Sequence, residues 1–270
     1  MSALDEARPA SDEETLAQLA RDLREAEGSR EPIGPLTESH PDLSVADAYR
    51  IQQLNVQARK ADGELVRGRK VGLTSLAMQQ QLGVDEPDFG AIFAAMIIEE
   101  GDAIPAAELI QPRAEAEIAF VMAEDLAGPG VSAADALRAV AGALPAIEVI
   151  DSRVADWKIK LPDTIADNAS SARVVCGGRL TAVDDLDLRL IGMALTHNGA
   201  VAATGAGAAV LGNPIRCVAW LANKLGEFAV GLRAGDLVLA GALHAAVPVA
   251  PGDSFTAQFA QLGSVTTRFD

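Results

Sequence analysis

Three glutamates stand in stretches that are otherwise apolar. Glu115 and Glu117 lie two residues apart in PRAEAEIAFVM (112–122), and Glu148 lies in AIEVID (146–151). Strand side chains two residues apart share one face of the sheet, about 6–7 Å apart along the backbone. Like charges this close need water or a cation between them. The pair alone therefore fits an exposed edge strand as well as a metal site.

The third glutamate favours the metal site. A carboxylate buried without a compensating partner is very costly, so three of them in apolar strands need an explanation. A set of carboxylates with no nearby Cys or His suits a hard cation such as Mg²⁺ or Mn²⁺, which keeps waters that a substrate can displace. The sequence therefore predicts a divalent-metal site at Glu115, Glu117 and Glu148.

Other segments hold groups that could act beside such a site. Lys70 stands between two glycines in GRKVGLTS (68–75) and could reach into a pocket, although a solvent-facing strand lysine is the more common outcome. Asp88, in a turn-like acidic loop (85–90), could handle protons or merely cap the turn. The polar segment DTIADNASS (163–171) could cap a helix or cradle a carboxylate with backbone N–H groups.

Composition narrows the function classes. The chain of 270 residues is 49% hydrophobic and 22% charged, which is an ordinary globular composition. A net charge of −16 argues against nucleic-acid and anionic-membrane partners. A small anionic substrate would need local positive charge, from a metal ion or a buried lysine. The three histidines are weak signals, although His244 could line a pocket mouth.

The chain is expected to be soluble and cytoplasmic. Its acidic start lacks the pattern of a secretory signal, and the run at 91–98 falls far short of the ~20 apolar residues of a membrane helix. Cys176 and Cys217 lie in apolar settings that fit reduced core thiols.

Two helices are expected ahead of the site. Ser11 with Glu14 has capping-box spacing, and leucines then recur at helical intervals. Ser44 with Asp47 opens a second helix that closes near Gly63. We expect residues 1–64 to form an N-terminal helical segment packed on the core.

Strands outnumber helices after this segment. Strands are predicted over 65–73, 115–122, 146–151 and in several pieces after 236, with a hairpin at Asn198-Gly199. Helices are predicted over 75–83 and 133–144 and after Asn213-Pro214. Because the strands and helices do not alternate regularly, the fold class is α+β with a mixed or rolled-up sheet, and 65–270 is the expected catalytic domain.

Several of these segments together resemble one family. GRKVGLTS, the GVDEPDFG loop, PRAEAEIAFVM, the block from PAIEVIDSR to DTIADNASS, AVLGNP and GALHAAVPVAPGD are similar to the 2-keto-4-pentenoate hydratases and 4-oxalocrotonate decarboxylases. Both belong to the fumarylacetoacetate-hydrolase-like superfamily. The resemblance runs from about residue 30 to the C-terminus, and its most specific part is the IEVIDSR to DTIADNASS block.

The resemblance implies a fold and a set of site residues. The fold is a mixed β-roll of the fumarylacetoacetate-hydrolase C-terminal type with an N-terminal helical cap, and the cofactor is Mg²⁺ or Mn²⁺. By position, the resemblance implies metal ligands at Glu115, Glu117 and Glu148, catalytic residues at Lys70 and Asp88, and substrate-binding residues at Ser170 and Ser171. Either serine hydroxyl could serve.

The resemblance also implies a reaction on a small 2-keto acid. The expected activity is a hydratase that adds water to 2-hydroxypenta-2,4-dienoate, giving 4-hydroxy-2-oxopentanoate in the meta-cleavage catabolism of aromatic compounds. The alternatives are a 4-oxalocrotonate decarboxylase and a non-catalytic metal-binding partner subunit. The family further implies a homo-oligomer, with a possible complex with a pathway decarboxylase or aldolase. The similarity of GALHAAVPVAPGD favours the hydratase.

Overall fold

The computed structural model describes residues 11–75, 79, 80, 84 and 86–270. Its strands are β1 (Val66–Gly72), β2 (Asp88–Phe93), β3 (Ile97–Ile98), β4 (Ala103–Ile104), β5 (Arg113–Met122), β6 (Val140–Ile150), β7 (Ser171–Cys176), β8 (Gly192–His197), β9 (Ala200–Ala206), β10 (Leu237–Ala242), β11 (Val247–Pro248), β12 (Ser254–Phe259) and β13 (Gly263–Phe269).

The helices fall into two kinds. The α-helices are α1 (Glu13–Ser29), α2 (Leu36–Ser39), α3 (Val45–Ala61), α5 (Ala133–Ala139), α6 (Leu161–Ala166) and α7 (Ile215–Gly226). The short 3₁₀ helices are η2 (Ala94–Met96), η3 (Ala106–Glu108), η4 (Ala155–Trp157), η5 (Asn168–Ser170), η6 (Leu188–Leu190) and η7 (Gly207–Ala209).

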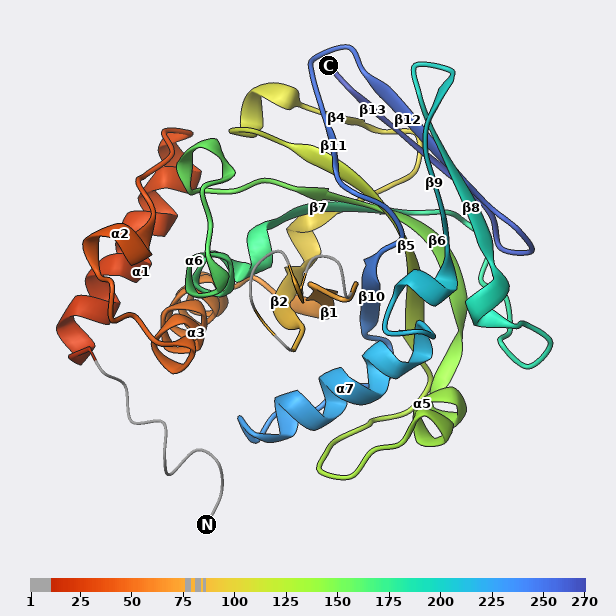
Figure 1. Ribbon diagram of the computed structural model, residues 1–270, viewed down its shortest axis with the longest axis horizontal. Coiled ribbons are helices and arrows are strands. Elements are labelled where there is room, and N and C mark those ends of the chain that lie inside the picture. The colour runs from red at the N-terminus through yellow and green to blue at the C-terminus, as the bar shows by residue number, and fades with distance from the viewer. Residues whose placement is uncertain (1–10, 76–78, 81–83, 85) are drawn as a thin grey trace.

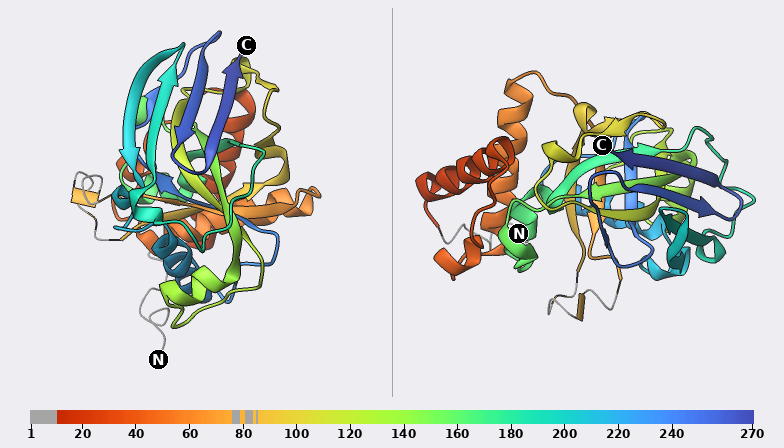
Figure 2. Two further views of the ribbon diagram at one scale, coloured as in Figure 1. Left: turned by 90° about the vertical axis from the view of Figure 1, so that its right-hand side faces the viewer. Right: turned by 90° about the horizontal axis from the view of Figure 1, so that it is seen from above.

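The strands form two mixed sheets. The larger has the order β2-β1-β10-β5-β6-β7-β3, with β11 added beside β5, and the smaller has the order β4-β13-β12-β8-β9. β1 runs parallel to β10, whereas β5 is antiparallel to both β10 and β6. The strands β8, β9, β12 and β13 lie together at one end of the molecule, and β6 contacts both β12 and β13 (Figures 1 and 2). The α+β prediction with a mixed, curled sheet is confirmed.

The helices gather on two sides of the strands. α1, α2, α3 and α6 lie at one side of the larger sheet, and α7 and α5 lie below it in the view of Figure 1. α7 packs on β10, while α6 contacts β2 and α3, so α6 joins the N-terminal helices to the sheet. Three of the helices precede residue 64, but the division into two parts at that point stays a prediction. Among the described residues, every helix is too short or too polar to cross a membrane.

Most local predictions hold. The Ser44–Asp47 capping box opens α3, the Asn198-Gly199 hairpin joins β8 to β9, and α7 begins directly after Pro214. The first helix is capped by Asp12, whose side chain accepts from the Thr15 N–H, and not by the predicted Ser11. The predicted helix at 75–83 lies mostly outside the described residues.

Two predictions are wrong for one reason. The helix expected over 133–144 ends at Ala139, because Val140 already pairs with Met122 and starts the long strand β6. Asp88, expected in a loop, is the first residue of β2 and pairs with Gly72 of β1. Both segments gain a neighbouring strand, and that tertiary pairing overrides local helix and turn propensity.

Candidate metal centre and active-site cavity

The register of β5 and β6 brings the three glutamates together. Glu115 pairs directly opposite Glu148, and Glu117 lies two residues farther along β5, so all three side chains share one face. One carboxylate oxygen from each lies within 4.8 Å of the other two. Opposed strand residues place their Cβ atoms only about 5 Å apart, so like charges there are unfavourable without a counter-ion.

Burial makes this cluster electrostatically costly. Glu117 and Glu148 are buried and Glu115 is half-buried. Burial, with the negative charge of Glu148, raises the pKa of Glu115 to about 7 and that of Glu117 well above its usual range. Neither oxygen of Glu148 has a hydrogen-bond partner among the described residues. Unpartnered buried carboxylate oxygens in an all-oxygen set fit a hard divalent cation.

One glutamate is oriented by the backbone. The N–H of Gly241 donates to Oε2 of Glu117 at 2.7 Å. Gly241 sits where the β10–β5 ladder shifts register, and its φ of 108° lies in the region that favours glycine. The irregularity in β10 thus aims a backbone donor at a carboxylate of the cluster.

Lys70 points into the same cluster. Its ammonium lies 3.1 Å from Oε2 of Glu148 as an ion pair without hydrogen-bond geometry, and it donates to the carbonyl oxygen of Ala169 at 2.9 Å. Burial disfavours the charged ammonium, but Glu148, Glu115 and Asp88 together raise the pKa of Lys70 above its usual value. Lys70 is therefore a buried, fixed cation.

Asp88 stands over a glycine at the edge of this group. A Cβ on Gly72 would lie 2.2 Å from Oδ1 of Asp88, so a larger residue there would displace the carboxylate. Oδ2 accepts a long hydrogen bond of 3.4 Å from Thr164, and Oδ1 has no partner among the described residues. Burial raises the pKa of Asp88, which favours its protonated form.

The residues that follow α6 hold a strained turn against the cluster. Asn168, Ala169 and Ser170 have φ values of 54°, 51° and 52°, a left-handed conformation that is unfavourable for residues other than glycine. The Asn168 side chain pins the turn by bonding both the N–H and the carbonyl of Ala91 in β2. Strain of this kind persists only where surrounding contacts over-determine it, and such places are often functional sites.

Both ring nitrogens of His244 contact backbone groups, so the ring is not a free base. Its Nε2 accepts from the N–H of Ala116, between the two β5 glutamates, at 2.8 Å, and its Nδ1 lies 2.6 Å from the carbonyl oxygen of Ala245. A ring that accepts at Nε2 must carry its proton at Nδ1, so both nitrogens are engaged. Burial lowers the pKa of His244, which keeps the ring neutral.

A cavity of about 610 Å³ joins these groups. Its lining includes the predicted residues Lys70, Asp88, Glu115, Glu117, Ser170 and His244, together with residues that the sequence analysis did not single out, among them Arg113, Trp157, Ile159 and Thr164. The sequence reasoning missed Arg113, Trp157 and Thr164. Arg113 could have been found, because it lies at strand spacing ahead of Glu115 and Glu117.

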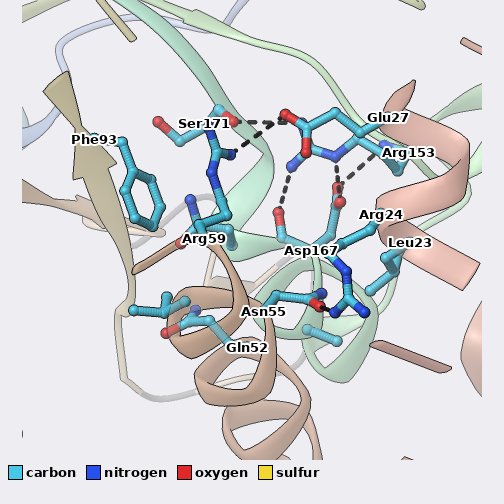
Figure 3. Close-up of a pocket in the computed structure, with 13 residues that line it drawn as sticks. Leu23, Arg24, Glu27, Gln52, Asn55, Arg59, Phe93, Arg153, Asp167 and Ser171 are labelled. Carbon is cyan, nitrogen blue, oxygen red and sulfur yellow. Dashed lines mark hydrogen bonds and ion pairs between the residues drawn. The ribbon is translucent and has the colours of Figure 1, made fainter. Parts of the chain in front are cut away.

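The two predicted serines line different cavities. Ser170 lines the large cavity and donates to Asp167 at 3.1 Å. Ser171 lines a separate cavity of about 40 Å³ under the N-terminal helices, where its buried hydroxyl has no partner among the described residues (Figure 3). Three arginines from α1, α3 and the β6–α6 connection surround this smaller cavity: Arg24, Arg59 and Arg153.

Relatives of the chain are named as hydratases. The chain is 48% identical over 259 residues to a 2-keto-4-pentenoate hydratase of Burkholderia vietnamiensis, covering 96% of this chain and 99% of the relative. It is 49% identical over 220 residues to a 2-hydroxypent-2,4-dienoate hydratase of Pseudomonas putida, covering 81% and 99% respectively.

Solved structures and a family model agree on the fold. A 4-oxalocrotonate decarboxylase from Pseudomonas putida G7, complexed with magnesium and adipate, superimposes with a TM-score of 0.94 at 39% identity, covering 97% of this chain and 100% of that one. The model for the fumarylacetoacetate hydrolase C-terminal domain matches residues 64–270. The chain belongs to the fumarylacetoacetate hydrolase family, in the group of 2-keto-4-pentenoate hydratases and 4-oxalocrotonate decarboxylases.

Proposed function

We propose that the chain is a divalent-metal-dependent hydratase that adds water to 2-hydroxypenta-2,4-dienoate and releases 4-hydroxy-2-oxopentanoate. The observation that carries the proposal is the cluster of three carboxylates beside a cavity of about 610 Å³, with Glu148 oxygens that have no hydrogen-bond partner among the described residues. Relatives at 48% and 49% identity are named as hydratases of this substrate class. This likeness favours an enzyme over a non-catalytic partner subunit.

Glu115, Glu117 and Glu148 would hold the metal ion, which we propose to be Mg²⁺ or Mn²⁺. Their oxygen-only donor set suits both ions, and a solved neighbour was crystallised with magnesium. A bound divalent cation would supply Lewis-acid stabilisation of the negative charge that develops on a 2-keto acid. The chain's own contribution is to hold the three carboxylates on one face of β5 and β6.

Lys70 is proposed to act as a cation and hydrogen-bond donor. Its raised pKa keeps the ammonium charged at neutral pH, so it is unsuited to remove a proton. Its contacts to Glu148 and the Ala169 carbonyl fix its position without using all three of its N–H groups. The remaining donor capacity can bind an oxygen of the substrate.

Asp88 is proposed to carry a proton during turnover. Its pKa is raised by burial, and one of its oxygens is free of partners among the described residues. A carboxyl group shifted toward neutral pH exchanges protons more effectively than one at its ordinary pKa. Ser170, which lines the cavity, is the proposed substrate-binding hydroxyl, in preference to Ser171.

The 4-oxalocrotonate decarboxylase activity stays the second candidate. The neighbour that superimposes with a TM-score of 0.94 has this activity in its name. Both reactions act on 2-keto acids that the same carboxylate cluster could serve. A cytoplasmic location, a homo-oligomer and a complex with a pathway enzyme also stay predictions.

The deciding experiment uses purified protein with Mg²⁺ or Mn²⁺ and two substrates in parallel. Loss of ultraviolet absorbance from 2-hydroxypenta-2,4-dienoate, with 4-hydroxy-2-oxopentanoate formed and turnover abolished by EDTA, is the expected result. Release of CO₂ from 2-oxohex-3-enedioate without hydration of the first substrate would transfer the chain to the decarboxylase activity. EDTA-resistant hydration would overturn the metal assignment.

A further inference from the structure

His244 lies at a gap in the larger sheet, beside the glutamate cluster. β10 pairs with β5 as far as Glu117, and β11 resumes the pairing at Ala114, so the stretch of β5 between these two points has no continuous strand on that side. Residues 243–246 connect β10 to β11 across the gap without being part of either strand. A backbone group of β5 that is buried in such a gap needs another partner, because leaving it unpaired is costly.

Two consecutive residues of this connection satisfy Ala116, the residue between the two β5 glutamates. The Leu243 N–H donates to the Ala116 carbonyl oxygen at 3.1 Å. The Ala116 N–H donates in turn to Nε2 of His244 at 2.8 Å. In a regular antiparallel ladder, both bonds would go to the backbone of a single partner residue. The imidazole ring therefore takes the place of a missing backbone carbonyl.

The ring is held so that it can accept this hydrogen bond. Its Nδ1 lies 2.6 Å from the carbonyl oxygen of Ala245, which can only accept, so Nδ1 carries the ring proton and Nε2 is left as an acceptor. His244 is half-buried and lines the active-site cavity. Contacts at both nitrogens thus give the ring one tautomer and one orientation.

The two bonds to Ala116 set the directions of both neighbouring glutamates. Each peptide group is planar, so the Ala116 N–H lies in the plane shared with Glu115, and the Ala116 carbonyl lies in the plane shared with Glu117. Fixing both planes fixes the directions in which the two glutamate side chains leave the strand. The Gly241 N–H also donates to the Glu117 carboxylate. Residues 241–244 therefore hold this part of β5 from the edge opposite β6.

We propose that His244 is a positioning residue of the metal centre, whose ring holds Glu115 and Glu117 in the geometry that binds a divalent cation. The inference rests on the proposed function, in which these glutamates are metal ligands. Mg²⁺ demands near-ideal octahedral geometry, so small displacements of its ligands weaken its binding. Loss of a group that orients metal ligands typically lowers metal affinity by about 10- to 100-fold.

The test compares two replacements of the ring by calorimetric titration of the metal-free protein with Mg²⁺. His244→Leu has no acceptor, so the Mg²⁺ affinity should fall by about 10- to 100-fold. His244→Gln offers a side-chain carbonyl oxygen that can accept from the Ala116 N–H, so it should keep most of the affinity. His40→Leu is the matched control and should leave the affinity unchanged, because His40 lies between α2 and α3, where its ring contacts Ser39.

A second measurement is made on the unsubstituted protein. Long-range ¹H–¹⁵N NMR spectra show which ring nitrogen of a histidine carries the proton, and the signal that disappears in His244→Gln belongs to His244. The proton should lie on Nδ1. A proton on Nε2 would overturn the proposal, because Nε2 could then not accept from the Ala116 N–H.

The outcomes separate the role of His244 from the proposed function. If the unsubstituted protein does not bind Mg²⁺, the metal site fails together with the positioning role. If the unsubstituted protein binds Mg²⁺ and folded His244→Leu binds it equally well, or if His244→Gln loses as much affinity as His244→Leu, the positioning role alone fails.

Urea unfolding of the metal-free variants measures their stability separately from their affinity. A ring that served only to complete the sheet would support stability, and its loss would leave the Mg²⁺ affinity of the folded protein unchanged. A loss of Mg²⁺ affinity confined to His244→Leu, with the ring proton of the unsubstituted protein on Nδ1, supports the proposal.

Discussion

The two cavities described above differ in how their buried charges are compensated. In the smaller one, Arg59 pairs with Glu27, and Arg153 pairs with Asp167 (Figure 3). In the larger one, three carboxylates face one another, and Lys70 is their nearest cation. Both carboxylates that line the smaller cavity, Glu27 and Asp167, have an arginine partner, whereas the larger cavity holds more carboxylates than cations.

This difference distinguishes a structural site from the one that we propose to be functional. The backbone N–H and the Nε–H of the buried Arg153 both donate to the carboxylate of Asp167, and its Nη2 donates to the Asp167 carbonyl oxygen. These hydrogen bonds fix the turn before β7. A network satisfied in this way rigidifies the fold. Uncompensated buried charge destabilises a fold, so the excess of carboxylates in the larger cavity indicates a bound ligand that neutralises them.

The largest expected effect comes from breaking the paired cavity. Arg153→Met leaves the buried Asp167 carboxylate unpaired, and we expect the free energy of unfolding to fall by about 3–5 kcal/mol. Urea unfolding measures it. The control is Arg138→Met, which breaks an exposed pair with Asp135 and should cost less than about 1 kcal/mol. Equal losses in both variants would contradict the structural role of Arg153.

The larger cavity should respond in metal affinity and in activity. Glu148→Gln removes a ligand charge, so Mg²⁺ affinity and turnover should fall by at least about a hundredfold, beyond the effect of losing an outer-shell partner. Calorimetric Mg²⁺ titration checks this, with the exposed Glu124→Gln as control. Normal Mg²⁺ affinity in Glu148→Gln would refute the ligand assignment.

A pH series sharpens the comparison further. The pKa of Glu115 is raised by burial to about 7 in the folded chain, above the ordinary value of 4.5. Its contribution to stability is therefore complete below pH 4.5 and is lost as the pH rises through about 7. The metal-free protein should lose up to about 1.4 kcal/mol per pH unit for each proton released in that window.

Mg²⁺ should oppose this loss, because it binds the deprotonated carboxylates. Thermal unfolding between pH 5 and 8, with and without Mg²⁺, measures both effects. Glu115→Gln is the matched control and should flatten the slope of the metal-free curve. If the stability of the metal-free, unsubstituted protein did not change with pH in this window, the carboxylates would repel one another less than their geometry indicates.

The smallest expected effect distinguishes two adjacent hydroxyls. Ser170→Ala removes a group from the larger cavity and should lower kcat/KM by about tenfold, the cost of one hydrogen bond to a bound ligand. Ser171→Ala deletes a buried hydroxyl without a partner among the described residues, so activity should persist and stability should not fall. A larger activity loss in Ser171→Ala would reverse the assignment.

Local sequence patterns were enough to predict much of the fold and to group the three glutamates that the structure brings together. The spacing of Glu115 and Glu117 fixes their shared face, whatever their partners are. The capping box at Ser44 and the Asn198-Gly199 hairpin depend on neighbours within a few residues, and both are confirmed. Glu148 could be grouped with the pair because a carboxylate in an apolar strand demands compensation.

Features that depend on distant pairing could not be predicted. The opposition of Glu115 and Glu148 follows from the register between β5 and β6, which no local pattern specifies. The local sequence around Asp88 indicates a loop, and only the pairing of β2 with β1 makes it a strand residue. The separation of Ser170 from Ser171 depends on the left-handed turn at 168–170, a conformation that the residue types there do not favour.

The hydrogen bond from Lys70 to the Ala169 carbonyl has a consequence for mutational scanning. The acceptor is a main-chain oxygen, so no side-chain deletion at residue 169 removes it. A scan that replaces each residue by alanine would leave this position silent, since it is already alanine. Its importance would emerge only with proline or β-branched residues, which cannot adopt a φ of 51° without strain. Loss of activity there would come from a displaced carbonyl oxygen at a position that has no polar side chain.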